Sequence, residues 1–183
     1  MNLYEKAILY AIRAHGDTKR RYTQDPYIVH PIEVSALLRK YTTDEDSIIA
    51  AILHDVVEDT DITIEDIEKE FGLDIALLVD ELTDKFTKEA FPDLNRAHRK
   101  KRERERIASI STKSKKIKLC DMISNLGDFV NHFDLVMAND KDFAQLYVRE
   151  KEAILEVIKD CDDIILWEET NDIMKSCRER LFL

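Results

Sequence analysis

The segment AAILHDVVEDT, residues 50–60, places a histidine beside an aspartate and a second pair of acids four positions further on. On one continuous helix, His54 lies one turn from Glu58 and Asp55 lies one turn from Asp59, so the four side chains form two neighbouring stripes. Nearly all other residues of the segment are apolar, which predicts a buried helix. Buried carboxylates need a compensating partner, and a divalent cation also accounts for the imidazole.

Two further segments carry polar residues in similar apolar surroundings. DPYIVHP places His30 at the entry of a helix, where an extended segment can direct a side chain into a site. IKLCDMISNL places Asp121 inside an apolar helix, with Asn125 one turn later. Taken alone, the first segment also fits a hydrogen-bonded core histidine followed by acids like those at a helix N-terminus. Two imidazoles and two carboxylates together suit Mn²⁺, Fe²⁺ or Zn²⁺. The candidate ligands are His30, His54, Asp55 and Asp121.

The elements that position these residues are predicted to be helices. Apolar residues recur at three- and four-residue spacing along most of the chain, and only three glycines and three prolines interrupt them. The 183 residues suffice for one core, and no linker or repeat divides them, so we expect a single all-α domain, residues 1–183. The expected helices cover residues 2–15, 31–40, 44–58, 63–71, 73–83, 93–109, 113–132, 140–160 and 162–180.

The charge distribution argues against a nucleic-acid binder. The net charge is −10, yet the segment from Arg96 to Lys118 carries eleven Lys or Arg against two Glu, about +9. One basic band on an acidic protein does not supply the broad positive face that a duplex requires. A small phosphate-rich ligand is the better match, although RAHRKKRERER also fits a solvated helix face with Arg and Glu pairs.

Composition also bears on compartment and assembly. No apolar run approaches the roughly 18 to 20 residues of a membrane span, and the first residues lack the features of a leader. Three cysteines without CxxC spacing argue against a disulfide framework and a thiolate zinc site. We expect a cytoplasmic protein with reduced thiols and no membrane partner. The apolar stripe of the last helix suits either the core or a contact between subunits, which leaves a homo-oligomer open.

Four strings together resemble a known family. KRRYTQDPYIVHP, AAILHDVVEDT, FGLDIALLVDELTD and IKLCDMISNL are similar to the hydrolase domain of RelA/SpoT homologues, within the HD superfamily of metal-dependent phosphohydrolases. The resemblance is strongest to the stand-alone small alarmone hydrolases of the metazoan SpoT-like type. It covers about residues 4 to 130 and continues more weakly through LYVREKEAI. It implies an HD-superfamily bundle of about eight to ten helices.

The same resemblance implies a reaction and roles for individual residues. The reaction would be metal-dependent hydrolysis of guanosine 3′,5′-bis(diphosphate), or ppGpp, to GDP and pyrophosphate. Glu58 and Asp59 match the acidic pair that activates or orients the attacking water. The metal, commonly Mn²⁺ although another divalent cation is an alternative, would be bound by His30, His54, Asp55 and Asp121.

Substrate contacts follow from the same matching. The residues concerned are Arg20 and Arg21 at the nucleotide base, Asn125 and Lys118 near the metal, Tyr147 at the sugar, and Arg99 and Lys100 at the distal phosphates. The sequence departs from the family pattern at RYTQD, which replaces a short glycine-bearing loop, and at Gly127, where arginine is frequent. Both departures leave the base preference open.

Two alternatives to this function stay open. One is an HD phosphohydrolase that acts on another phosphorylated nucleotide, for example the 2′-phosphate of NADPH. The other is a nucleotide-binding module without catalysis, which the presence of all four ligand positions and both acids disfavours. In each case the partner is a small phosphorylated nucleotide.

Overall fold

The computed structural model describes residues 1–181, apart from the side chain of Asp140. Within this range the chain forms ten helices and no β-strand, which confirms the all-α prediction. The helices are α1 (Leu3–His15), α2 (Val29–Leu38), α3 (Glu45–Leu53), α4 (Val56–Asp59), α5 (Ile64–Phe71), α6 (Leu73–Leu82), α7 (Arg96–Ile107), α8 (Thr112–Asn131), α9 (Phe133–Val157) and α10 (Ile164–Leu181).

Local signals in the sequence set several of the helix ends. Thr63 begins α5 through a capping box with Asp66, and Gly72 ends the same helix with a φ of 92°, a conformation that favours glycine. Ser111 caps α8 by accepting a hydrogen bond from the Ser114 amide. At α7 the cap is Asn95, whose side chain accepts from His98, so this helix begins three residues later than predicted.

The predicted helix 44–58 was wrong in one respect that matters for the site. The chain forms α3 up to Leu53 and α4 from Val56, with His54 and Asp55 in the turn between them. At Asp55 ψ is −6°, far from the helical value of about −42°. On a continuous helix, the side chains of consecutive residues point about 100° apart and so diverge. Because the helix breaks here, the consecutive side chains of His54 and Asp55 converge, and His54 Nε2 lies 3.1 Å from Asp55 Oδ2.

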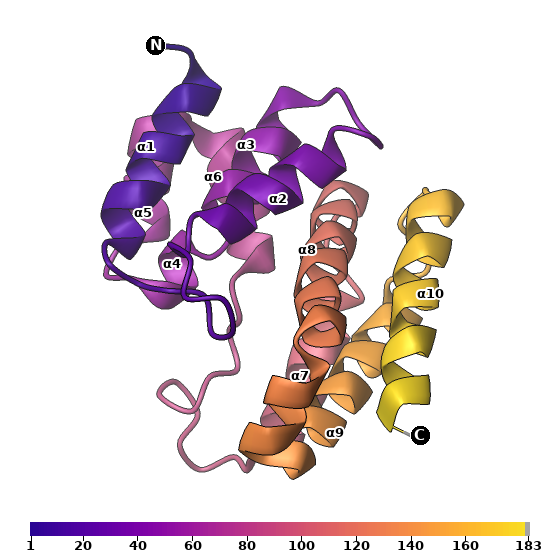
Figure 1. Ribbon diagram of the computed structural model, residues 1–183. Helices are drawn as coiled ribbons and strands as arrows, with labels where there is room; N and C mark the ends of the chain where they lie inside the picture. The colour runs from indigo at the N-terminus through magenta and orange to yellow at the C-terminus, as the bar shows by residue number, and fades with distance from the viewer. Residues whose placement is uncertain (182–183) are drawn as a thin grey trace.

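The helices form two groups joined by α8. Figure 1 shows α1 to α6 gathered on one side and the longer helices α7, α8, α9 and α10 on the other. α8 packs against α2 and α3 on the first side and against α10 and α9 on the second. Its residues Ile117, Leu119 and Met122 are completely buried. The three elements that carry the candidate ligands, α2, the end of α3 and α8, therefore contact one another directly.

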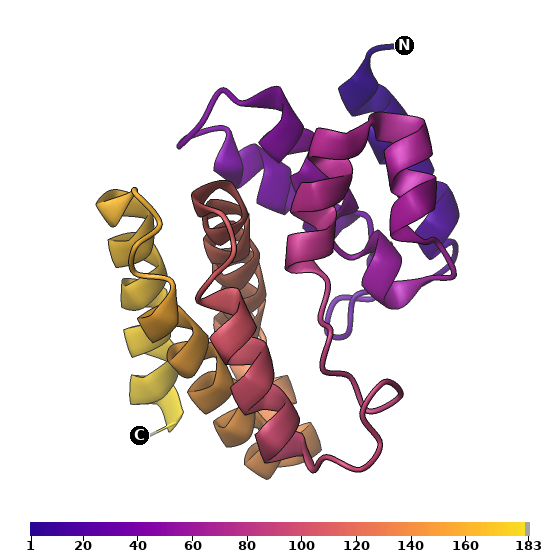
Figure 2. The same cartoon turned by 180° about the vertical axis from the view of Figure 1, so that it is seen from behind.

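The loop of residues 83–95 connects the two groups, as seen from behind in Figure 2. Glu103 of α7 anchors the start of this loop. Its side chain is buried, and one carboxylate oxygen accepts hydrogen bonds from the amides of Lys85, at 2.9 Å, and Phe86, at 3.0 Å. The other oxygen accepts from Arg106 Nε at 2.6 Å. Arg106 also donates to the Glu81 carbonyl at 2.8 Å. This network fixes the start of the loop against α7.

The structure also shows where the cysteines and the apolar residues of the last helix lie. All three cysteines are free and buried. None of the helices in the described range is both long and apolar enough to cross a membrane. On α10, Leu166 is buried, whereas Ile164 and Ile165 are 55% and 63% exposed. The contact between subunits stays a prediction.

We expect Glu103→Ala to lower the free energy of unfolding by about 3 kcal/mol, because it removes the buried ion-pair partner of Arg106 and leaves two loop amides without an acceptor. Urea denaturation followed by circular dichroism measures this change. Glu105→Ala is the matched control on the same helix, since Glu105 is exposed and pairs only at 3.8 Å with Lys101; its effect should stay within about 0.5 kcal/mol. Equal effects of the two substitutions would contradict the anchoring role of Glu103.

Candidate active site

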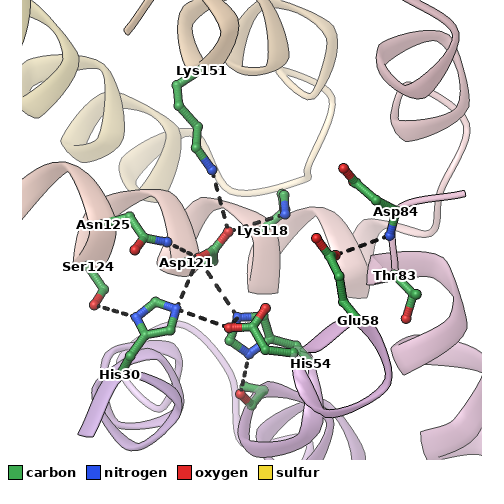
Figure 3. Close-up of polar contacts among 12 residues, drawn as sticks. His30, His54, Glu58, Thr83, Asp84, Lys118, Asp121, Ser124, Asn125 and Lys151 are labelled. Atoms are coloured by element: carbon green, nitrogen blue, oxygen red, sulfur yellow. Dashed lines mark hydrogen bonds and ion pairs between the residues drawn. The ribbon is translucent and has the colours of Figure 1, made fainter. Parts of the chain in front are cut away.

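Two histidines and an aspartate from separate elements meet at one point. One ligand atom each from His30, His54 and Asp121 lies within 4.8 Å of the other two. His30 Nε2 is 3.2 Å from Asp121 Oδ1, and His54 Nε2 is 3.8 Å from the same oxygen. All three residues are buried. Figure 3 shows both imidazoles directed at the carboxylate on α8.

Asp55, the fourth predicted ligand, lies outside this group of three but contacts both histidines. Its Oδ2 is 3.1 Å from His54 Nε2 and 3.6 Å from His30 Nε2. The hydroxyl of Tyr27 donates a 2.7 Å hydrogen bond to the same carboxylate oxygen. The structure thus brings all four predicted ligands together, and Tyr27 orients one of them.

Hydrogen bonds on the far side of each imidazole fix its orientation. His54 Nδ1 lies 2.9 Å from the Ala51 carbonyl, which can only accept, so Nδ1 carries the proton. His30 Nδ1 lies 3.0 Å from Ser124 Oγ, and this hydroxyl in turn donates to Glu33 at 3.1 Å. In their neutral forms both rings therefore direct an unprotonated Nε2 towards Asp121, the arrangement typical of metal-binding histidines.

These residues fit a divalent cation. His54 Nε2 is buried and forms no well-aligned hydrogen bond among the described residues, although the carboxylates of Asp55 and Asp121 lie 3.1 and 3.8 Å away. Its surroundings are thus acidic and suit a cation. Burial lowers the pKa of His54, but the carboxylates of Asp55 and Asp121 outweigh that effect and raise the pKa to about 10. The same concentration of negative charge that retains a proton on His54 also favours a metal ion, which would release that proton on binding.

Glu58 and Asp59 lie on the short helix α4 beside the cluster. Glu58 Oε2 accepts a hydrogen bond from the Asp84 amide at 3.3 Å. Burial raises the pKa of Glu58 above its usual range, and the Asp84 carboxylate adds to the increase. Burial and the charge of Asp55 likewise raise the pKa of Asp59. A carboxylate of raised pKa accepts a proton more readily, which suits a general base.

A cavity of about 330 Å³ opens beside these acids. Acidic and basic side chains line it together, the basic ones coming from α7, α8 and α9. The acidic lining residues include Asp55, Glu58, Asp59, Asp84 and Asp121. The basic lining residues are Arg96, Lys100, Arg104, Lys118 and Lys151. An anionic ligand held near a cation would meet these basic side chains.

A second cavity of about 260 Å³ adjoins the first and shares Tyr27, Asn125, Phe143 and Tyr147 with it. Its other lining residues include both predicted base-contacting arginines, Arg20 and Arg21. Its walls also contain the aromatic rings of Tyr22 and Phe129. A flat aromatic base suits such a cavity better than a phosphate does.

The two arginines of the second cavity have different surroundings. Arg20 is buried and forms an ion pair with Asp128, and it also donates to Asn125 Oδ1 at 3.4 Å. Arg21 is exposed, and its guanidinium carbon lies 5.0 Å from the centroid of the Phe143 ring. Arg20 is thus held in place, whereas Arg21 presents a cation over an aromatic face.

The other predicted substrate contacts also have defined positions. Lys118, Asn125, Lys100 and Tyr147 line the first cavity. Arg99 lines neither cavity, and its guanidinium donates to the Leu94 carbonyl. Its contact with the distal phosphates stays a prediction.

Sequence reasoning missed several cavity residues, among them Tyr27, Asp84 and Lys151. For Lys151 a signal was present, because it lies one turn after Tyr147 and so shares a helix face with a predicted substrate contact. Tyr27 lies one turn before His30 within PYIVHP. Asp84 carried no comparable signal, since its position depends on the course of the loop after α6.

We expect Tyr27→Phe to weaken Mn²⁺ binding about 10- to 100-fold, because it removes the hydrogen bond that orients the Asp55 carboxylate. Isothermal titration calorimetry with Mn²⁺ measures the change. Tyr10→Phe is the matched control, since Tyr10 packs edge-on against Phe71 at 5.2 Å between ring centroids. An unchanged affinity in Tyr27→Phe would exclude this role of the hydroxyl.

Comparison with known proteins places the chain in a family. The sequence pattern of the HD domain family matches residues 7–134. The guanosine-3′,5′-bis(diphosphate) 3′-pyrophosphohydrolase MESH1 of Drosophila melanogaster is 41% identical over 128 residues, which are 68% of this chain and 68% of that protein. The enzyme of the same activity from Aquifex aeolicus is 44% identical over 79 residues, and the match spans only 11% of its length.

A solved structure agrees with these sequence matches. It is a metazoan orthologue of SpoT, described as hydrolysing ppGpp, and it superposes with a TM-score of 0.81 and 30% sequence identity. The superposition covers 96% of this chain and 95% of the orthologue. The chain therefore belongs to the HD domain family and, within it, to the RelA/SpoT-homologue hydrolase type.

Proposed function

We propose that this protein is a metal-dependent hydrolase that converts ppGpp to GDP and pyrophosphate, with residues 1–183 acting as one catalytic domain. The observation that carries the proposal is the first cavity, whose lining brings basic side chains together with the acidic pair Glu58 and Asp59. Two of the candidate ligands, Asp55 and Asp121, line the same cavity. The relatives named for this activity support it. The three unpaired cysteines fit a reducing compartment, and we propose the cytoplasm.

The proposed cation is Mn²⁺, held by His30, His54, Asp55 and Asp121. Mixed imidazole and carboxylate ligands suit Mn²⁺, although Fe²⁺ and Zn²⁺ accept the same groups. When bound, the cation lowers the pKa of water and polarises a phosphoryl oxygen. The close approach of the ligand atoms of His30, His54 and Asp121, all within 4.8 Å of one another, supports a cation at this position.

In the proposed reaction Glu58 accepts a proton from the attacking water, and Asp59 orients that water. The water oxygen forms a bond to the phosphorus attached to the 3′-oxygen, and the bond between this phosphorus and the 3′-oxygen breaks. The 3′-oxygen leaves as the hydroxyl of GDP after it takes up the proton that Glu58 accepted. Lys118 and Lys100 neutralise negative charge on the two phosphoryl groups that become pyrophosphate.

The two adjoining cavities suggest how the substrate lies. We place the nucleoside in the second cavity, with the base near Arg20 and Arg21 and the sugar near Tyr147. The 3′-diphosphate then extends into the first cavity towards Lys100. Asn125 lies at the boundary of both cavities, and its side chain donates to Asp121, so it can contact the substrate beside the cation.

The direct test is an incubation of the purified protein with ppGpp, with and without Mn²⁺, followed by ion-exchange chromatography of the products. We expect GDP and pyrophosphate to appear only when Mn²⁺ is present. His54→Ala serves as the control and should lose metal binding and turnover together. Release of orthophosphate from NADPH, with ppGpp left intact, would replace the proposed substrate by another phosphorylated nucleotide.

We expect Glu58→Gln to retain Mn²⁺ binding and to lower kcat by roughly 10²-fold or more, because the amide cannot accept the proton of the attacking water. Calorimetry with Mn²⁺ and steady-state kinetics with ppGpp measure the two effects separately. Glu65→Gln on the exposed surface of α5 is the matched control and should leave both unchanged. Full activity of Glu58→Gln would rule out its role as the base.

A further inference from the structure

Lys151 of α9 extends from the second half of the chain to the candidate metal site (Figure 3). Its Nζ lies 4.0 Å from Asp121 Oδ2, and Lys118 Nζ lies 3.2 Å from the same oxygen. The Lys151 and Lys118 side chains are only 16% and 14% exposed. Two largely buried ammonium groups thus lie within 4.0 Å of one carboxylate oxygen.

The two oxygens of Asp121 separate the metal side of the site from the lysine side. Oδ1 faces His30 and His54 and accepts a hydrogen bond from Asn125. Oδ2 faces Lys118 and Lys151. The ammonium groups therefore lie next to the position of a cation without competing for it. A phosphate oxygen that approaches the cation from the cavity meets both lysines.

Lys151 differs from Arg96 and Lys100, two other basic residues of the first cavity, in how its charge is balanced. Arg96 forms a two-point pair with Glu150, at 2.9 and 2.7 Å, and Lys100 pairs with Asp84 at 2.9 Å. For Lys151 the ion pair in the described structure is the longer contact to Asp121, which Lys118 already holds more closely. The charge of Lys151 is thus available to a ligand.

The side chain of Lys151 is held in the cavity by its neighbours. Its Nζ lies 5.6 Å from the centroid of the Tyr147 ring, one turn earlier on α9. Tyr147 in turn stacks on Phe129 of α8, with 6.0 Å between ring centroids. This packing restricts the ammonium group before any ligand binds, which lowers the entropy lost on binding.

We propose that Lys151 contacts the substrate directly and binds, together with Lys118, a non-bridging oxygen of the phosphoryl group that is transferred to water. This rests on the proposed function. An ammonium group at this position stabilises the negative charge that the phosphoryl group carries in the transition state. The ligand class is a phosphate ester or diphosphate whose reacting phosphorus lies beside the cation.

The test is Lys151→Met, compared with Lys141→Met on an exposed part of the same helix. We expect Lys151→Met to lower kcat for ppGpp about 10²-fold and to leave the Mn²⁺ affinity within about two-fold of the wild-type value. The same substitution should weaken binding of inorganic phosphate to the Mn²⁺-loaded protein about ten-fold. Lys151→Arg should restore part of both losses, because it returns the positive charge. Lys141→Met should behave as the wild type.

Two results would overturn the proposal. One is wild-type kcat and phosphate affinity in Lys151→Met. The other is a loss of Mn²⁺ affinity that parallels the loss of kcat, because Lys151 would then act by holding Asp121 and not by touching the substrate. The phosphate titration needs no turnover. If the wild-type protein leaves ppGpp intact, the proposed function fails, while the titration still decides whether Lys151 binds phosphate.

Discussion

The buried carboxylate of Asp121 connects the two sides of the candidate active site. One of its oxygens faces the imidazoles of His30 and His54, and the other faces the ammonium groups of Lys118 and Lys151. A buried carboxylate without partners is strongly unfavourable, so it requires positive or hydrogen-bond-donating groups around it. Both sets of partners contact the one carboxylate group of Asp121. The covalent geometry of that carboxylate therefore fixes the distance between the side that faces the histidines and the side that faces the lysines.

The helices that carry this carboxylate and its partners are held by the core. α2, α3 and α8 contact one another, and the residues of α8 on either side of Asp121 are fully buried. Groups mounted on packed helices keep their positions more accurately than groups on loops. The loop of residues 83–95 also contributes a cavity residue, Asp84, and here the buried Glu103 provides the rigidity that secondary structure does not.

Residues from two parts of the chain line the first cavity. The HD domain pattern covers residues 7–134 and includes the candidate ligands and the acidic pair. Tyr147 and Lys151 lie beyond that range on α9, whose position is tied to α7 by the pair between Arg96 and Glu150. Substitutions on α9 can therefore change substrate contacts while the ligands on α2, α3 and α8 stay in place.

The sequence by itself determined the all-α class and the four ligand candidates, because both depend on local signals: helical spacing of apolar residues, and polar residues within otherwise apolar segments. Only the tertiary structure decided how those residues meet. At the break between Leu53 and Val56, Asp55 contacts Tyr27 from a distant segment, and local spacing does not indicate such a contact. For charged residues on helices, too, the sequence did not indicate which side chains line the cavity. Lys100 lines the cavity and its neighbour Arg99 does not, because a cation in a helical run looks the same in sequence whether it faces solvent or a ligand.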